Sequence, residues 1–277
     1  MSYLQTILWG IIIGLAELLP VSGSAHIAFL EELFGQTSAR TEHALFYGLL
    51  DLALVIALLL SCRQDVSAAF HGLGTLLGKP SPRSRRNADR ADQRLVLLIA
   101  VGLLPLLLDI ALWRLSLVLY VKPLFWALML IGGGALLFRA SFMTRGTKEA
   151  KQLQLSDAFL MGLGQAAAIL PGVSGMGLMI GIGHRRGLQP AFALRFAFLL
   201  MIPTLFGSGV IRIIRALVLG VHAAYIPAYL VGMVVCALTA FGAVSLLRGA
   251  VARRKINLFA FYCWGAAVFA LFLFLIT

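Results

Sequence analysis

Long apolar stretches alternate along the chain with short polar connections. A stretch of roughly 20 apolar residues crosses the hydrocarbon core of a bilayer as an α-helix, because lipid offers no hydrogen-bond partner to an unpaired backbone group. Six stretches qualify, at residues 44–62, 95–112, 123–138, 191–212, 224–247 and 258–276. Their apolar residues are continuous and do not alternate at every second position, which argues against a transmembrane β-barrel. The pattern predicts an all-α integral membrane protein with six transmembrane helices.

Two more apolar stretches are interrupted. Residues 4–34 are broken by Pro-Val-Ser-Gly-Ser at 20–24, and residues 158–183 are broken by Pro-Gly-Val-Ser-Gly at 171–175. Proline cannot donate a helical hydrogen bond, glycine frees the backbone, and serine hydroxyls can pair with the released amides. Such backbone survives at membrane depth only beside protein or a wet cavity. We expect two re-entrant helical hairpins, with a surface loop or a kinked helix as the alternatives.

The order of these segments suggests an internal repeat. Residues 1–150 and residues 151–277 each contain one broken hairpin followed by three spans, within a single membrane domain of residues 1–277. Because three is an odd number, the second half must enter the membrane in the opposite orientation. An inverted repeat with broken helices near the midplane is typical of transporters.

Charge agrees with this arrangement. The composition is 61% hydrophobic and 12% charged, with a mean hydropathy of +0.96 and a formal net charge of +12. Of the 23 basic residues, 17 lie at 63–94, 139–151, 185–186 and 248–255, in short connections beside apolar stretches. The positive-inside bias accounts for these groups, places those at 63–94, 139–151 and 248–255 in the cytoplasm and puts both termini outside. Phospholipid headgroups are sufficient partners for them, and no nucleic acid is indicated.

The first broken segment carries the strongest candidate chemistry. Glu17 lies three residues before the break in an apolar context, where an ionisable group is costly and is a functional candidate. Ser22, Ser24 and His26 follow within nine residues. A carboxylate, hydroxyls and an imidazole could activate a nucleophile and move its proton. The alternative is that these side chains only satisfy backbone groups freed by the break.

The second broken segment offers a phosphate cradle. Ser174 and the amides around Gly172 and Gly175 could bind an anion at the start of a half-helix. Asp51 lies inside a span, so we expect it to have a partner, and Arg195 is the candidate. The three cysteines indicate neither a disulfide nor a metal site.

These motifs resemble a known family. The stretch Gly-Leu-Ala-Glu-Leu-Leu-Pro-Val-Ser-Gly-Ser-Ala-His at 14–26 is similar to the first signature of the bacterial undecaprenyl pyrophosphate phosphatases, also called bacitracin-resistance proteins. Residues 165–177 resemble the second signature, Gln-x-x-Ala-x-x-Pro-Gly-x-Ser-Arg-Ser-Gly. Phe-Ala-Phe-Leu-Leu-Met-Ile-Pro at 196–203 resembles a third element of the family. The likeness extends over essentially the whole chain.

The resemblance implies a multi-pass protein of the bacterial inner membrane that removes the terminal phosphate of undecaprenyl pyrophosphate and so recycles this cell-wall lipid carrier. By matching positions it implies catalytic roles for Glu17, Ser22, Ser24 and His26, and a substrate-binding role for Ser174 with its neighbouring glycines. The likeness also allows a divalent cation, Mg²⁺ or Ca²⁺, and a homodimer. The residues themselves fix no metal site.

The chain departs from the family pattern at positions that matter for catalysis. Ile13 stands in place of the first glutamate, Gly23 in place of the second serine, and Gly175 in place of the phosphate-binding arginine. Arg195 occupies the position of a family glutamate, so we expect it to supply the missing positive charge from another direction. The alternative function is a non-hydrolytic transporter or flippase of polyprenyl phosphate or another anionic amphiphile.

Overall fold

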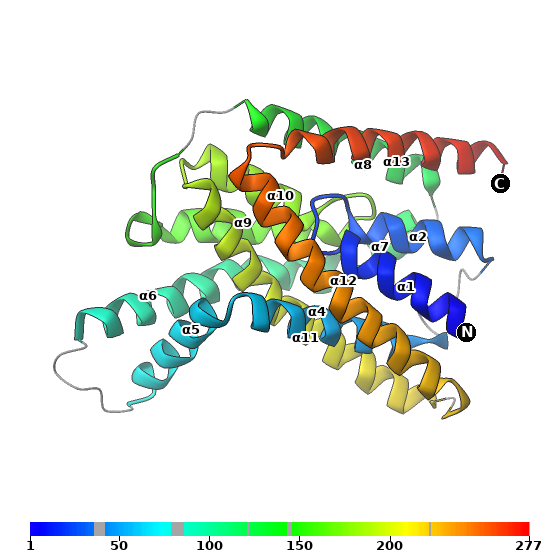
Figure 1. Ribbon diagram of the computed structural model, residues 1–277, viewed down its shortest axis with the longest axis horizontal. Helices are drawn as coiled ribbons and strands as arrows, with labels where there is room; N and C mark the ends of the chain where they lie inside the picture. Colours follow the sequence, from blue (N-terminus) through cyan, green and yellow to red (C-terminus); the bar gives the residue numbers. More distant parts are fainter. Residues whose placement is uncertain (36–41, 79–85, 121, 143–145, 222, 277) are drawn as a thin grey trace.

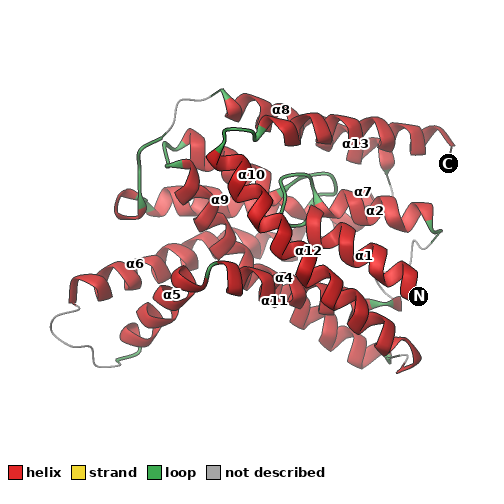
Figure 2. Ribbon diagram, viewed as in Figure 1, coloured by secondary structure: helices red, strands yellow, loops and turns green. Residues whose placement is uncertain are grey.

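The structure is a computed structural model that describes residues 1–35, 42–78, 86–120, 122–142, 146–221 and 223–276 (Figure 1). The described residues form helices joined by loops and contain no strand of a sheet (Figure 2). The longer helices are α1 (Tyr3–Ala16), α2 (Gly23–Leu33), α4 (Ala44–Ser61), α5 (Arg63–Leu76), α6 (Arg86–Leu103), α7 (Leu107–Tyr120), α8 (Pro123–Ser141), α9 (Leu155–Ala166), α10 (Gly175–Arg185), α11 (Pro190–Leu219), α12 (Ile226–Ala252) and α13 (Asn257–Ile276).

Six helical segments are long and apolar enough to cross a membrane, which confirms the all-α class and the number of spans. The segments are Ala44–Ser61, Ala88–Asp109, Pro123–Ser141, Pro190–Leu219, Ala223–Ala252 and Asn257–Leu275. The expected span at 95–112 is not one straight helix, because the chain changes to a short 3₁₀ turn at Leu104–Leu106 around Pro105 before α7 begins. Proline removes the amide that would continue the α-helical hydrogen bonds. The sequence also did not indicate α5, a separate helix that follows α4 at Cys62.

The two broken segments each fold as a pair of short helices. α1 packs against α2 and α9 packs against α10, and each pair is joined by a loop that contains the predicted break. A helix of 11 to 14 residues is about 16–21 Å long at a rise of ~1.5 Å per residue, which is short of the ~30 Å hydrocarbon core. In Figure 1 both connecting loops lie near the centre of the molecule. That the pairs are re-entrant in the bilayer stays a prediction.

Helices of the first half of the chain pack on helices of the second half. α1 packs on α12 and, correspondingly, α9 packs on α6. α10 packs on α8, while α2 meets α13 through edge-to-face contact of Phe29 with Phe269. The first spans of the two halves, α4 and α11, pack together, as do the third spans, α8 and α13. This reciprocal pairing supports the inverted repeat.

Glycines permit the close crossings in this arrangement. On α4 and α11, a Cβ added at Gly48 would lie 3.0 Å from the carbonyl oxygen of Gly209, and a Cβ at Gly209 would lie 3.1 Å from that of Gly48. At the α6–α9 crossing, a Cβ at Gly162 would collide with the carbonyl of Gly102. Small residues let membrane helices approach until their backbones touch. Glycine at positions 48 and 209 therefore lets α4 and α11 cross with their backbones in contact.

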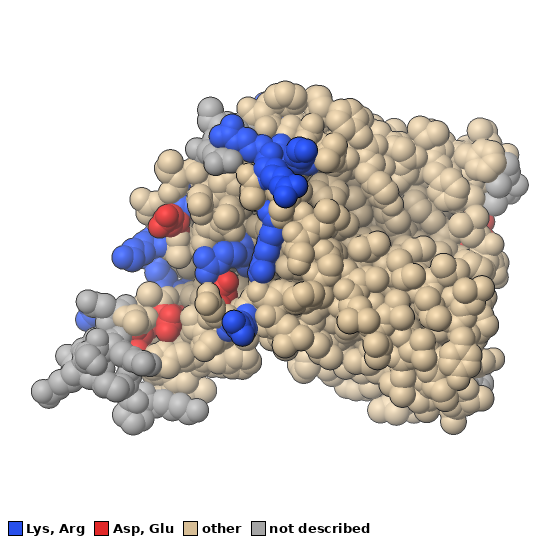
Figure 3. Space-filling view, viewed as in Figure 1, with Lys and Arg blue, Asp and Glu red and all other residues tan. Residues whose placement is uncertain are grey.

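Lysine and arginine side chains gather at one end of the molecule (Figure 3). There Arg248 of α12 donates to the Ser61 carbonyl at the end of α4, and Arg94 of α6 donates to the Leu153 carbonyl before α9. We call this the basic end. The first residues of α1 and the last residues of α13 lie at the opposite end (Figure 1), as the charge pattern of the sequence predicts.

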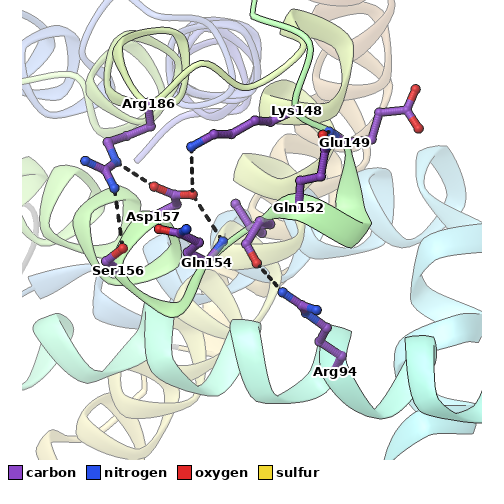
Figure 4. Close-up of polar contacts among 9 residues, drawn as sticks. Arg94, Lys148, Glu149, Gln152, Gln154, Ser156, Asp157 and Arg186 are labelled. Carbon is purple, nitrogen blue, oxygen red and sulfur yellow. Dashed lines mark hydrogen bonds and ion pairs between the residues drawn. The ribbon is translucent and has the colours of Figure 1, made fainter.

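Asp157 of α9 ties the second helix pair together at the basic end (Figure 4). Its side chain is fully buried, and Oδ1 lies 2.5 Å from Nε of Arg186, which directly follows α10. Oδ2 accepts from the backbone amide of Gln154 at 3.1 Å and lies 3.8 Å from Nζ of Lys148. The open ends of α9 and α10 are thus held together opposite their connecting loop.

Candidate functional site

Two helices begin side by side at the centre of the molecule, each capped by a serine. Ser22 Oγ accepts from the amide of Ala25 at 3.3 Å at the start of α2, and Ser174 Oγ accepts from the amide of Gly177 at 3.2 Å at the start of α10. A Cβ at Gly177 would lie 3.4 Å from Pro20 Cβ, so the first turn of α10 lies against the loop that precedes α2. A helix N-terminus presents amides without an intrahelical acceptor and a partial positive charge. The pair of capped starts therefore makes a setting for an anion.

The Ser22 backbone is unusual. Its φ is +68°, a conformation that residues with a Cβ adopt at a cost of order 1–3 kcal/mol. Its side chain is buried, and its hydroxyl also lies 3.2 Å from that of Ser24. The strained residue thus directs the chain from the loop into α2 and joins the two hydroxyls of the first motif.

A small polar cavity of about 30 Å³ lies between the two helix starts. Its wall includes Glu17, Ser24, Gln165, Ser174 and Gly175. This volume is enough for one water molecule or for a phosphate oxygen that enters from outside. The structure thus brings together four predicted site residues from the two broken segments: Glu17, Ser24, Ser174 and Gly175.

Glu17 reaches into this cavity from the end of α1. A Cβ added at Gly23 would collide with the Glu17 carboxylate, so the carboxylate occupies the space that a side chain at position 23 would need. The absence of a side chain there places an acidic group directly beside the first residue of α2. A carboxylate beside a helix start can accept a proton from a bound nucleophile.

Gln165 lies across the cavity from this carboxylate, near the end of α9. It is 6% exposed, and its Oε1 has no hydrogen-bond partner within the described part of the chain. A Cβ at Gly175 would lie 2.5 Å from that oxygen. A buried acceptor without a partner is costly, which suggests that a ligand or water pairs with it. Nothing in the spacing of Gln165 along the chain indicated this acceptor.

His26 is not among the residues that line the cavity, and two hydrogen bonds hold its ring. Nδ1 lies 2.8 Å from the Ser22 carbonyl oxygen, and Nε2 lies 2.7 Å from the Tyr262 hydroxyl on α13. The two rings also stack, with centroids 5.6 Å apart. Tyr262 is a residue that sequence reasoning missed.

Arg195 lies elsewhere. Its guanidinium binds both carboxylate oxygens of Asp65 on α5, with Nε 2.9 Å from Oδ2, and neither residue lines the cavity. Binding a phosphate in place of Asp65 would require Arg195 to leave this pair. The expectation that Arg195 neutralises Asp51 is wrong: Asp51 Oδ2 accepts from Ser208 at 2.8 Å and lies 3.3 Å from Nε of Arg212.

Comparison with known proteins gives the family. Residues 6–269 match the family model described as bacitracin resistance protein BacA. The chain belongs to the BacA family. It is 33% identical over 270 residues to an undecaprenyl-diphosphatase of Desulfosudis oleivorans, a match that covers 95% of this chain and 96% of the relative. It is 31% identical to one of Methanobrevibacter smithii, with 95% of each chain covered, and 30% identical to one of Syntrophotalea carbinolica, with 98% of this chain and 99% of the relative covered.

Two of the positions at which the chain departs from the family pattern, Gly23 and Gly175, line the cavity. A serine at position 23 would need the Glu17 carboxylate to move, and an arginine at position 175 would need Gln165 to turn. The two departures face the same cavity from opposite helices. They therefore lie directly beside Glu17 and Gln165, two polar side chains of the cavity wall.

Proposed function

We propose that the protein is a phosphatase that hydrolyses a polyprenyl pyrophosphate, of the undecaprenyl class, to the monophosphate and inorganic phosphate. The observation that carries this proposal is the meeting of Glu17 with two serine-capped helix starts at one small polar cavity. All the relatives reported above are named undecaprenyl-diphosphatase, and this similarity favours hydrolysis over a non-hydrolytic transporter.

In this mechanism the terminal phosphate of the lipid lies against the starts of α2 and α10. Backbone amides at Gly172, Gly175 and Gly23 and the Ser174 hydroxyl stabilise its charge, which spreads over its oxygens in the transition state. Two converging helix N-termini take over part of the work of the missing arginine.

The attacking group is a water molecule held in the cavity. Glu17 accepts its proton as the oxygen bonds to the terminal phosphorus, and the bond from that phosphorus to the bridging oxygen breaks, which leaves the polyprenyl monophosphate. Gln165 Oε1 orients the water by accepting a hydrogen bond from its second O–H group. Ser22 and Ser24 hold the loop in place, and His26 relays protons at the edge of the site.

A divalent cation could be held at this cavity only if phosphate oxygens of the substrate supplied some of its ligands. The cavity offers oxygen ligands, as Mg²⁺ and Ca²⁺ prefer, from one carboxylate, one amide with an empty acceptor and serine hydroxyls. The described residues contain no cluster of three or more His, Cys, Asp or Glu side chains that could hold a metal by themselves. When bound, such an ion would neutralise phosphate charge, with Glu17 and Gln165 as its ligands from the protein.

We further propose that the protein lies in the bacterial inner membrane with the basic end in the cytoplasm. The lysine and arginine side chains at that end meet the positive-inside bias and the anionic headgroups of the inner leaflet. The two helix pairs would then be re-entrant, with the cavity within the membrane and the termini outside.

The test is phosphate release from undecaprenyl pyrophosphate by the purified full-length chain in detergent micelles. We expect Glu17→Gln, which keeps the shape of the side chain but cannot accept the proton, to lower kcat by a factor of about 10² or more. The control is Glu32→Gln, near the end of α2, which makes the same substitution at a residue that does not line the cavity and should leave kcat unchanged. Absence of phosphate release by the parent protein, with or without Mg²⁺ or Ca²⁺, would overturn the proposal.

A further inference from the structure

α5 is a short helix at the basic end that is not one of the spans. It begins at Arg63, directly after Cys62 at the end of α4, and it packs mainly on α6. Its 14 residues extend about 21 Å at a rise of ~1.5 Å per residue, and it is not among the six segments that could cross the membrane. The surroundings of α5 must therefore be inferred from the chemistry of its two sides.

The side of α5 that faces α6 is polar. His71 Nδ1 lies 2.9 Å from Asp92 Oδ2, and Thr75 Oγ1 accepts from Gln93 Nε2 at 3.3 Å. On the same side, a Cβ added at Gly72 would collide with the Asp92 carbonyl, so the two helices approach closely there. A surface helix of a water-soluble protein turns its apolar side, not its polar side, toward the neighbouring helices. α5 has the reverse arrangement.

The other side of α5 exposes large apolar side chains. Phe70 is 68% exposed and Leu77, which directly follows the helix, is 76% exposed; Leu73 and Leu76 are exposed as well. Positions 70, 73 and 77 have the i, i+3, i+7 spacing of one helix side. We call these four residues the apolar face of α5. Single exposed apolar residues are common, whereas a continuous strip of them marks a contact with an apolar partner.

The apolar face of α5 follows directly on the lipid-facing surface of a span. In the last turns of α4, Ile56 and Leu60 are also exposed, on a helix that is apolar enough to cross the membrane. Two residues, Ser61 and Cys62, separate this surface from the start of α5. In Figure 1 α5 leaves the end of α4 beside α6, which itself enters a span. Lipid that covers Leu60 therefore reaches the beginning of α5.

Charge places α5 at the level of the phospholipid headgroups. The connection at 63–94 that contains it carries seven lysine or arginine residues and three aspartates. Arg63 at the start of α5 is exposed, as are Arg90 and Arg94 on α6. Basic residues close to a span are attracted to the anionic lipids of the cytoplasmic leaflet. A helix with one apolar and one polar side lies there with its apolar side ~5–10 Å into the boundary between headgroups and acyl chains.

We propose that α5 is an interfacial helix whose apolar face inserts into the membrane leaflet at the basic end and contacts the acyl chains of its phospholipids. In the placement proposed above this is the cytoplasmic leaflet. The partner is the leaflet itself, not a second copy of the chain. α5 thereby holds the adjoining ends of α4 and α6 at a fixed depth in the membrane. The inference goes beyond the proposed phosphatase function and does not depend on it.

The experiment measures which side of α5 meets lipid in the full-length protein. A nitroxide label is attached at Phe70→Cys or Leu77→Cys, on the apolar face of α5. The matched control is Gln64→Cys, an exposed position seven residues before His71 and therefore on the polar side of the same helix. The native cysteines are buried, so the parent protein gives the background labelling. Vesicles of phosphatidylethanolamine and phosphatidylglycerol hold the protein.

Electron paramagnetic resonance then gives the accessibility of each label to oxygen, which concentrates among acyl chains, and to a water-soluble nickel chelate. We expect the ratio of oxygen to nickel accessibility at positions 70 and 77 to be about threefold or more above that at position 64, because the apolar side of an interfacial helix is below the headgroups. Leu73→Cys provides a third position on the apolar face of α5 if either variant fails to fold. Thermal unfolding checks that each labelled variant matches the parent.

Two results would overturn the proposal. One is an equal accessibility ratio at positions 64, 70 and 77, which would place the apolar face of α5 in water. The other is spin–spin broadening at position 70 that disappears when labelled protein is diluted with unlabelled protein, because the face would then join two copies of the chain. Neither readout involves phosphate release, so a parent protein that releases none would contradict the proposed function and leave this test intact.

Discussion

His26 and Tyr262 form a hydrogen bond of 2.7 Å between Nε2 and the phenolic oxygen, across 236 positions of sequence. The Ser22 carbonyl can only accept, so the 2.8 Å contact with Nδ1 places a proton on that nitrogen. In the neutral ring Nε2 is then the acceptor, and the tyrosine hydroxyl donates to it. Tyr262 therefore fixes both the ring orientation and the tautomer of the histidine in the first motif.

We expect Tyr262→Phe to lower phosphate release by a factor of about 2–10, which corresponds to the loss of one hydrogen bond of ~0.5–1.5 kcal/mol. The ring that stacks on His26 remains, so folding should be preserved. Tyr3→Phe removes a hydroxyl from the exposed start of α1 and serves as the control. A positioning role also predicts that His26→Ala and the double variant have nearly the same rate. If the two losses multiply instead, Tyr262 acts independently of His26.

The spans and the breaks could be predicted from the sequence because the bilayer imposes a length and because proline and glycine mark irregular backbone. The partners of the charged residues could not, since apolar periodicity does not state which helices face each other. Asp51 illustrates this. α4 and α11 are antiparallel, with Gly48 against Gly209, and this register brings Asp51 to Ser208 and Arg212. The same register leaves Arg195 beside Asp65, at the opposite end of the pair.

Some residues of the candidate site could likewise be predicted from the sequence, and others could not. Glu17, Ser24 and Ser174 belong to local motifs, so each could be named from the sequence. Tyr262 carries no local signal in the final apolar stretch, and Gln165 became informative only when its oxygen was found without a partner among the described residues.

Restoring the family arginine at position 175 should not by itself increase activity. The new Cβ would lie 2.5 Å from Gln165 Oε1 and 3.0 Å from Ala168 Cβ, so the side chain of Gln165 must turn away from the cavity. We expect Gly175→Arg to release phosphate no faster than the parent, and Gly175→Arg with Gln165→Ala to be faster than Gly175→Arg alone. Gln165→Ala by itself should be slower than the parent. Additive effects in this double-mutant cycle would show that the two positions are not coupled.

Asp51 is predicted to stabilise the α4–α11 pair. Removing the carboxylate in Asp51→Ala leaves Arg212 without its ion-pair partner and Ser208 without its acceptor. Because the Arg212 side chain is 36% exposed, we expect a loss of only about 1–3 kcal/mol, below the ~3–5 kcal/mol of a fully buried pair. Unfolding in detergent measures this loss. Ser208→Ala should cost about 0.6 kcal/mol, the mean for polar contacts between membrane helices.

The Asp51–Arg212 coupling is tested by the double variant. Asp51→Ala with Arg212→Ala should be more stable than Asp51→Ala alone, because no charge is then left unpaired in the membrane. A double variant whose loss equals the sum of the two single losses would contradict a direct interaction.

Asp157 provides the sharpest test of how the second helix pair is held, because its carboxylate is fully buried while its two cationic partners are each about one-third exposed. Asp157→Ala should destabilise the protein by about 2–4 kcal/mol and Asp157→Asn by about half of that, since asparagine can still accept from the Gln154 amide. Between the partners, Arg186→Ala should cost more than Lys148→Ala, because Arg186 contacts the carboxylate at 2.5 Å and Lys148 only at 3.8 Å. Thermal unfolding of the four variants in one detergent gives the order. Equal losses for Lys148→Ala and Arg186→Ala would mean that general positive charge at the basic end stabilises Asp157, and not the specific contact that joins α9 to the end of α10.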